Sequence, residues 1–314
     1  MYSKTGRTVV AVIIILAGVI LFNYPNIATF FNNITANRQV SEYQEAVEAM
    51  DDETKKEYFR LANLYNAALP TAFPADPFTM ENIRDFTGTE FEDFYMVQPG
   101  ATIGVLEVPQ INIKQPIYFG TSEEVLNKGL GLLENTSLPV GGNNSHAVIS
   151  GHTGMATRKL FTDLDQMKEG DLFFLHVMGE DFAYKVDQIK VVLPEHTEDL
   201  MIQQNHDYVT LLTCTPFGIN SHRLLVRGTR TPYDFLEDDD TPTTLKYWQR
   251  HIKEWIAGFG GMFLFLLLVF LKIRHDRKRD RQRAAAKAAA AGEAVAETIK
   301  NKGKKGQKKK KSKK

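Results

Sequence analysis

Short apolar or alternating runs of residues follow one another along the chain after Met96, and Gly, Pro, Asn and Asp separate them. This pattern predicts short β-strands, at "ATIGVLEVPQINIKQPIYFG", "HAVISGH", "LFFLHV", "FAYKVDQIKVVL", "YVTLLTC" and "HRLLVRGTR". Short helices are expected at "TRKLFTDLDQM" and "TEDLMIQ". Many short strands with few helices favour a closed β-barrel or a sandwich, so we expect a mainly β domain over residues 96–235.

The preceding segment, residues 25–95, has a helical pattern in its first half. Between Ser41 and Leu69 the apolar residues recur at spacings of three and four, as in an amphipathic helix. The pattern stops at Pro70, and "PTAFPADPFTM" brings three prolines within eight residues. Because proline cannot continue a helix, residues 70–80 are expected to form an extended loop.

Two longer apolar runs flank these segments. "TVVAVIIILAGVILFNY" lies between Arg7 and Pro25, which is expected to end it, and "WIAGFGGMFLFLLLVFLKI" covers residues 255–273. About 17–25 apolar residues cross a bilayer as a helix, so we expect a signal anchor over residues 1–24 and a second span over 255–273. The alternatives are a cleaved signal peptide for the first run and a buried core helix for the second. Residues 236–254 would link the β domain to the second span.

Charge is distributed unevenly along the chain, although the formal net charge is zero. Residues 274–314 hold 17 Lys and Arg against 4 Asp and Glu, which leaves a charge of −13 on the first 273 residues. Basic flanks of membrane spans stay on the cytoplasmic side. We therefore expect a two-pass membrane protein with both termini cytoplasmic and the β domain extracellular. The basic tail would contact anionic lipid, and a nucleic-acid partner is not expected.

Cys214 is the single cysteine of the chain, so no internal disulfide can form. It lies where the predicted strand "YVTLLT" meets the turn "TPFG". A free cysteine is often a small buried apolar residue. At a strand end, however, its side chain can meet a substrate, and a thiol nucleophile is the alternative interpretation.

A thiol nucleophile needs a proton shuttle and a group that stabilises negative charge. His152, in "VISGHTG", follows an apolar strand and enters a glycine-rich turn, which makes it the best candidate for the shuttle. His222 is a weaker candidate, and His146, His176, His196 and His206 read as surface or satisfied residues. Arg223 begins the strand after the turn and could hold an oxyanion, although its position taken alone favours a solvated strand-edge arginine.

Metal and cofactor motifs are missing from the sequence. It has no cysteine pair, no HExxH and no His/Asp cluster with ligand spacing. "GLGLLENTS" lacks the lysine and the spacing of a phosphate-binding loop. No metal and no cofactor are therefore expected.

The stretch "TLLTCTPFGINSHRLLVRG" resembles the active-site signature of sortases, the Gram-positive cysteine transpeptidases, in which TLxTC is followed nine residues after the cysteine by arginine. Cys214 and Arg223 match these two positions, and "SGHTG" matches the upstream Gly-His segment with His152. The resemblance implies a sortase-type barrel and thioacyl transfer. Thr213 and Ser221 are plausible neighbours of the substrate pocket.

Other features resemble class C, the pilus-assembly sortases. That class has a second membrane span and a lid with an Asp-Pro-aromatic motif, which Asp76, Pro77 and Phe78 match. The resemblance implies that Phe78 lies on Cys214 and His152, and that Asp76 approaches Arg223. It also implies pilin partners that carry an LPxTG-like sorting signal and an acceptor lysine. A housekeeping sortase and a non-catalytic membrane-anchored scaffold are the alternatives, and the sequence leaves the oligomeric state open.

Overall fold

The computed structural model describes residues 4–69, 76–78, 100–155, 157–232, 267–289 and 292. The chain divides into two compact units: Leu16–Trp248 forms one, and Met1–Ile15 with Gln249–Lys314 forms the other. The predicted linker 236–254 and most of the predicted span 255–273 lie outside the described residues, as does most of the loop 70–80. Residues 267–289 are helical.

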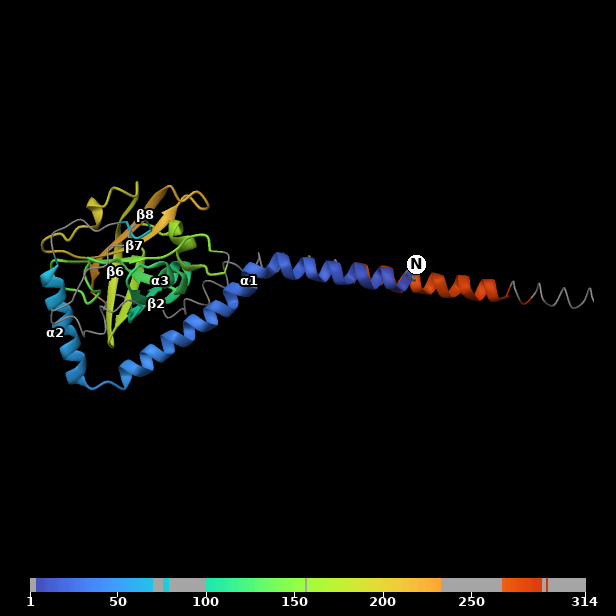
Figure 1. Cartoon of the computed structure of the whole chain (residues 1–314), viewed down its shortest axis with the longest axis horizontal. Helices are drawn as coiled ribbons and strands as arrows, with labels where there is room; N and C mark the ends of the chain where they lie inside the picture. The colour runs from blue at the N-terminus through green and yellow to red at the C-terminus, as the bar shows by residue number, and fades with distance from the viewer. Residues whose placement is uncertain are drawn as a thin grey trace, which may run out of the picture. The chain divides into compact units, whose positions relative to one another are not determined.

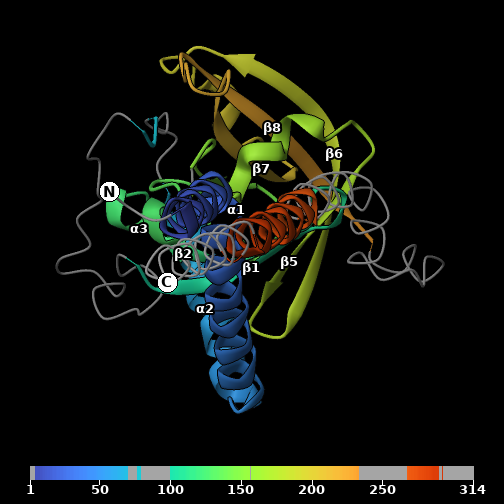
Figure 2. The same cartoon turned by 90° about the vertical axis from the view of Figure 1, so that its right-hand side faces the viewer.

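Eight strands form a closed barrel in the order β1-β2-β3-β4-β7-β8-β6-β5 (Figures 1 and 2). The closed-barrel alternative of the sequence analysis is therefore confirmed. The strands are β1 (Thr102–Val108), β2 (Ile113–Phe119), β3 (Leu130–Leu132), β4 (Ser145–Ser150), β5 (Leu172–Val177), β6 (Glu180–Val192), β7 (Asp207–Thr215) and β8 (His222–Thr231).

Most neighbouring strands are antiparallel, but β2 pairs with β3 and β4 with β7 in parallel. The β2–β3 connection contains helix α3 (Glu123–Lys128), which the sequence analysis missed. Burial alternates along β5, as expected for a strand with one face on the core, whereas all six residues of β4 are buried. A strand buried on both faces needs cover outside the barrel as well as a core inside it.

The connections also contain short 3-10 helices. These are Pro109–Ile111, Leu160–Gln166 and Glu198–Leu200. The last two lie within the stretches "TRKLFTDLDQM" and "TEDLMIQ", where short helices were expected.

The helical segment differs from its prediction in two respects. Helix α1 (Lys4–Glu48) continues through Pro25, which was expected to end the first apolar run. The helix expected over Ser41–Leu69 is interrupted, and α2 (Asp52–Ala68) begins anew after Asp51. The Asp51 carboxylate accepts a hydrogen bond from the Thr54 amide at 2.7 Å, which caps the new helix and explains the break.

Both helices are fastened to the barrel by polar contacts. In α2, the Tyr58 hydroxyl donates to the Ile103 carbonyl at 3.3 Å. Asn66 bonds both backbone groups of Leu138, accepting from its N–H at 2.7 Å and donating to its C=O at 3.1 Å. In α1, the Tyr43 hydroxyl accepts from the Met178 N–H at 3.1 Å. The helical segment thus packs against the barrel.

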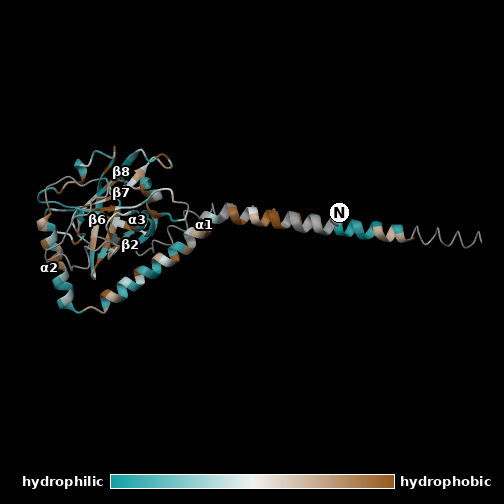
Figure 3. Cartoon of the chain, in the orientation of Figure 1, coloured by the Kyte–Doolittle hydropathy of each residue, from teal (hydrophilic) through white to brown (hydrophobic). Residues whose placement is uncertain are grey.

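Helix α1 contains a run of hydrophobic residues, coloured brown in Figure 3, and many of their side chains between residues 13 and 34 are exposed. Those of Ile14, Ile20, Leu21 and Phe31 are more than half exposed. Among the residues that the structure describes, no helix combines the length and the apolar character that crossing a membrane requires.

Candidate active site

The parallel pairing of β4 with β7 brings His152 and Cys214 to the same end of the barrel. The register pairs Ser150 with Leu212. His152 and Cys214 each follow these partners by two residues. The Gly151 N–H donates to the Leu212 carbonyl at 3.1 Å, so the ladder continues past the end of β4. Because side chains alternate between the two faces of a strand, His152 and Cys214 extend the face that Ser150 and Leu212 occupy.

Arg223 reaches this position from the other neighbour of β7. The antiparallel register of β7 with β8 places it directly opposite Cys214 (strands in Figure 2). The Cβ atoms of such opposite residues are about 4.5–5.5 Å apart. We call His152, Cys214 and Arg223 the thiol row. The next residues inward on the same face, Ser150, Leu212 and Leu225, form the serine row.

Asp76 and Phe78 cover the thiol row from a distant part of the chain. The Arg223 guanidinium donates to the Asp76 carboxylate twice, from Nε to Oδ1 at 2.6 Å and from Nη2 to Oδ2 at 2.7 Å. The Phe78 ring lies 5.6 Å from the His152 ring, centroid to centroid, and the Arg223 Cζ atom lies 5.1 Å from the Phe78 ring centroid. Arg223 is 5% exposed, Asp76 7% and Cys214 9%, so these three residues are buried, whereas His152 is partly exposed.

Phe78 packs into an apolar seat on the outside of the barrel. The seat consists of Leu133, Val148, Leu200, Leu212 and Leu225, with Val192 at its side. Leu212 and Leu225 belong to the serine row, so the seat begins one step inward from Cys214. This apolar surface is the cover that the fully buried strand β4 requires.

Burial keeps the reacting groups neutral in this closed arrangement. It raises the pKa of the Cys214 thiol; the charge of Arg223 opposes that shift, and the charge of Asp76 adds to it. Burial lowers the pKa of His152, with Glu123 opposing. A neutral thiol beside a neutral imidazole is a resting pair, because nucleophilic attack requires the thiol to give up its proton.

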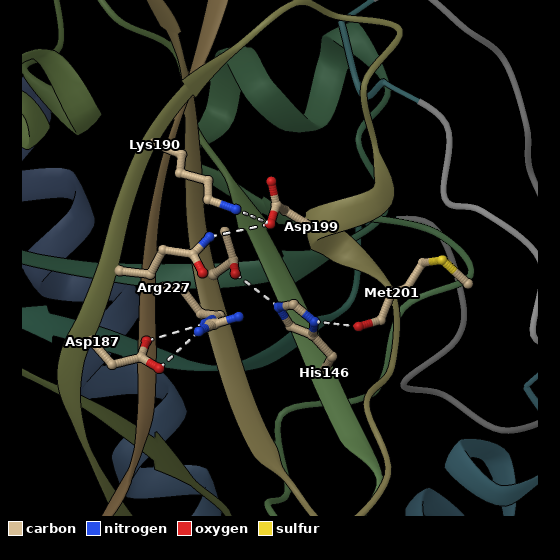
Figure 4. A network of polar contacts seen from close by, with 8 residues as sticks. His146, Asp187, Lys190, Asp199, Met201 and Arg227 are labelled. Atoms are coloured by element: carbon tan, nitrogen blue, oxygen red, sulfur yellow. Dashed lines mark hydrogen bonds and ion pairs between the residues drawn. The ribbon is translucent and has the colours of Figure 1, made fainter.

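A polar network holds the β6–β7 connection, which carries Leu200, against the barrel (Figure 4). His146 is fully buried and bonds the Met201 carbonyl at 2.9 Å and the Thr210 hydroxyl at 2.7 Å. Lys190 of β6 donates a hydrogen bond at 2.5 Å to Asp199, which lies in this connection. Burial lowers the pKa of His146 to about 4, so its ring is neutral and can donate one hydrogen bond and accept the other.

The sequence predicts that His146 is a surface or satisfied residue, and the structure shows a satisfied, buried one. Its contribution to the Phe78 seat was missed, because nothing in "NSHAVIS" indicates which loop would cover the strand. The alternation of His146, Val148, Ser150 and His152 was the available signal that these residues share a face.

The two residues expected near the substrate pocket have different surroundings. The Thr213 hydroxyl is buried and donates to the Gly151 carbonyl at 2.7 Å, so it braces the turn that carries His152. Ser221 is exposed and bonds Nδ1 of His222 at 2.8 Å. Within the described ranges, no three His, Cys, Asp or Glu side chains are grouped so that they could hold a metal ion.

Comparison with known proteins shows one family. The family model of the sortase domain matches residues 106–231. Among solved structures, sortase C of Streptococcus pneumoniae is 48% identical with a TM-score of 0.56, and the match covers 62% of this chain and 97% of that one. Sortase C of Clostridium perfringens, described with the C-terminal cell wall sorting motif, is 48% identical with a TM-score of 0.54. The match covers 63% of this chain and 100% of that one.

A pilus-related sortase C of Group B Streptococcus is 42% identical with a TM-score of 0.56, covering 62% of this chain and 98% of that one. Curated relatives match over shorter parts. Sortase D of Bacillus subtilis is 29% identical over 136 residues, which are 42% of this chain and 66% of that protein. Sortase A of Streptococcus agalactiae is 31% identical over 36% of this chain and 47% of its own length.

Proposed function

Because this chain belongs to the sortase family, whose members are cysteine transpeptidases, we propose that it cleaves an LPxTG-like sorting signal between Thr and Gly. It then joins the acyl group to a lysine amine of a pilin subunit and so polymerises pili. The observation that carries the proposal is the thiol row: Cys214 lies opposite Arg223, and His152 extends the parallel neighbouring strand at the same end. The likeness to class C enzymes, one of them described as pilus-related, supports the pilin substrate.

The thiol row supplies the groups that thioacyl transfer requires. His152 takes the proton of Cys214, and Sγ attacks the threonine carbonyl to give a tetrahedral oxyanion. The Arg223 guanidinium donates hydrogen bonds to that oxyanion. The C–N bond then breaks, His152 protonates the leaving glycine amine, and a thioester remains on Cys214. The lysine ε-amine attacks the thioester and loses a proton to His152, the C–S bond breaks to leave an isopeptide bond, and His152 returns that proton to the departing thiolate of Cys214.

The closed arrangement must open before this reaction can occur. Both outward donors of Arg223, Nε and Nη2, are taken by Asp76, and Phe78 lies against His152 and Arg223. A substrate carbonyl needs the same donors, and an apolar substrate side chain needs the seat that Phe78 fills. Asp76, Pro77 and Phe78 thus form a lid, and the sorting signal replaces it.

We further propose that the barrel works outside a membrane that both ends of the chain enter. The exposed apolar side chains of α1 support this location, since the surfaces of soluble proteins rarely present so many neighbouring apolar side chains. The basic residues 274–314 would then lie at the cytoplasmic surface, where each contributes about 1 kcal/mol of attraction to anionic lipid.

The direct test is the intact mass of the purified full-length chain after incubation with an LPETG peptide. A peptide acyl adduct is expected on the wild-type chain and not on Cys214→Ala, and a lysine-containing pilin peptide should discharge it. Cys214→Ala should keep its thermal unfolding temperature, because Cys214 lies at the strand end rather than within the main core. Absence of the adduct even after substitution of Asp76 and Phe78 by alanine would contradict the proposed function.

A further inference from the structure

Ser150, the last residue of β4, has an unusual hydroxyl. The residue is fully buried, yet its Oγ atom has no hydrogen-bond partner among the residues that the structure describes. Buried hydroxyls are normally paired, since leaving one unpaired costs free energy. The neighbouring buried hydroxyls follow this rule, namely those of Thr136, Ser137, Ser145, Thr210 and Thr213.

The position of this hydroxyl gives it a candidate partner. Ser150 belongs to the serine row and lies beside Leu212, a member of the apolar cluster that Phe78 packs against. The serine row is two strand residues inward from the thiol row. A strand rises about 3.3 Å per residue, so the rows are about 7 Å apart. An extended peptide that runs inward along this face from a scissile carbonyl at Cys214 presents the carbonyl two residues upstream at the level of Ser150.

We propose that the Ser150 hydroxyl donates a hydrogen bond to a backbone carbonyl of the sorting signal, that of the residue two positions before the scissile threonine. In an LPxTG-like signal this is the proline carbonyl. The inference rests on the proposed function and adds a specificity-determining residue to it. The hydroxyl is unpaired while the lid covers the seat, and it becomes paired when the sorting signal enters.

The two halves of the subsite act together. The apolar seat accepts any side chain of suitable size, as it accepts Phe78, and so discriminates weakly. A buried hydroxyl that must be paired discriminates more strongly, because a ligand that fails to place a carbonyl there leaves the hydroxyl unsatisfied. Ser150 thus selects ligands by a hydrogen bond to their backbone, while Leu212 and Leu225 select them by apolar contact with a side chain.

Steady-state transpeptidation of an LPETG peptide by the full-length chain tests the proposal, with Ser150→Ala compared with wild type. We expect KM to rise about fivefold with little change in kcat, the effect of losing one neutral hydrogen bond made in ground and transition state alike. A peptide with a thioamide at the proline carbonyl, a weaker acceptor, should lose efficiency with wild type but lose nothing further with Ser150→Ala.

Thermal unfolding separates this role from a structural one, and Ser137→Ala is the matched control. Ser137 is equally buried, but its Oγ accepts a hydrogen bond from the His146 N–H at 3.0 Å. Ser137→Ala should unfold at a lower temperature than wild type, whereas Ser150→Ala should not, since it loses no protein partner.

Wild-type KM in Ser150→Ala would overturn the inference while leaving the proposed function intact. So would an unfolding temperature lowered as much as in Ser137→Ala, since Ser150 would then have a partner in the free protein. The inference would also be overturned if the thioamide reduced kcat/KM by the same factor in Ser150→Ala as in wild type, since the two changes would then act independently. If neither the wild-type chain nor the variant with alanine at Asp76 and Phe78 forms an adduct with the peptide, the proposed function and the inference fail together.

Discussion

The Asp76–Arg223 ion pair yields the sharpest quantitative prediction, that of Asp76→Ala. Both side chains are buried, and two short hydrogen bonds join them. Removing one partner of such a pair costs about 3–5 kcal/mol, because the remaining charge stays buried without compensation. This cost falls only on the closed lid, since Arg223 is solvated once the lid leaves. The equilibrium between closed and open lid should therefore shift by roughly two to three and a half orders of magnitude, at about 1.4 kcal/mol per tenfold.

Alkylation of Cys214 by iodoacetamide, followed by intact mass over a range of pH, measures this shift. Opening removes the cover from the thiol, so Asp76→Ala should react faster than wild type at every pH. The midpoint of the pH–rate profile should also move to lower pH. Burial and the Asp76 charge both raise the pKa of Cys214, and both are relieved, so the thiolate forms at lower pH.

Asp187→Ala provides the matched control. The Asp187 carboxylate makes a comparable bidentate pair away from the lid. It accepts hydrogen bonds from Nε and Nη2 of Arg227, in β8, at 3.1 and 2.9 Å. It should alkylate as wild type does. Equal alkylation of Asp76→Ala and wild type, or an equal acceleration in Asp187→Ala, would refute the idea that this ion pair closes the lid.

Two further substitutions test the scaffold. Asn66→Ala should lower the free energy of unfolding by about 1–3 kcal/mol in urea titrations, because both backbone groups of buried Leu138 lose their partner; Asn63→Ala, which loses only a bond within α2, should change it far less. His176→Gln should destabilise the protein at pH 5.5 but not at pH 9. Burial lowers the pKa of His176, but Glu107 and Asp181 raise it, and the net shift is upward. The stability that protonated His176 contributes is therefore fully present below its pKa in the unfolded chain, and it disappears as the pH rises through its pKa in the folded protein. Equal loss at both pH values would contradict the assignment.

Local patterns in the sequence were sufficient to predict most of the barrel, and they proposed Cys214, His152 and Arg223 as the candidate site residues. Runs of alternating residues broken by turn residues predict strands, because each strand signal lies within a few neighbours. The spacing of Cys214 and Arg223 is also a local signal. They flank one short turn, so the antiparallel pairing that sets them opposite each other is a local consequence of the hairpin. Helix α3 escaped prediction because a six-residue helix has too few turns to show a period.

The break between α1 and α2 was within reach of the sequence, since Asp51 and Thr54 form a recognisable cap. The continuous apolar stripe obscured it, because the same spacing runs on both sides. Helix α1 continues through Pro25 because a proline that lacks a donor weakens a helix without always ending it.

What the sequence determined by itself was the set of chemical groups: a single thiol, an imidazole and a guanidinium, each next to a strand end. The tertiary structure decided their environment. The parallel pairing of β4 and β7 joins segments some 60 residues apart, and Asp76 meets Arg223 across 147 residues. Such contacts depend on how the barrel closes, which no local pattern specifies. The unpaired hydroxyl of Ser150 is the clearest case, because burial and the absence of a described partner are properties of the packed molecule alone.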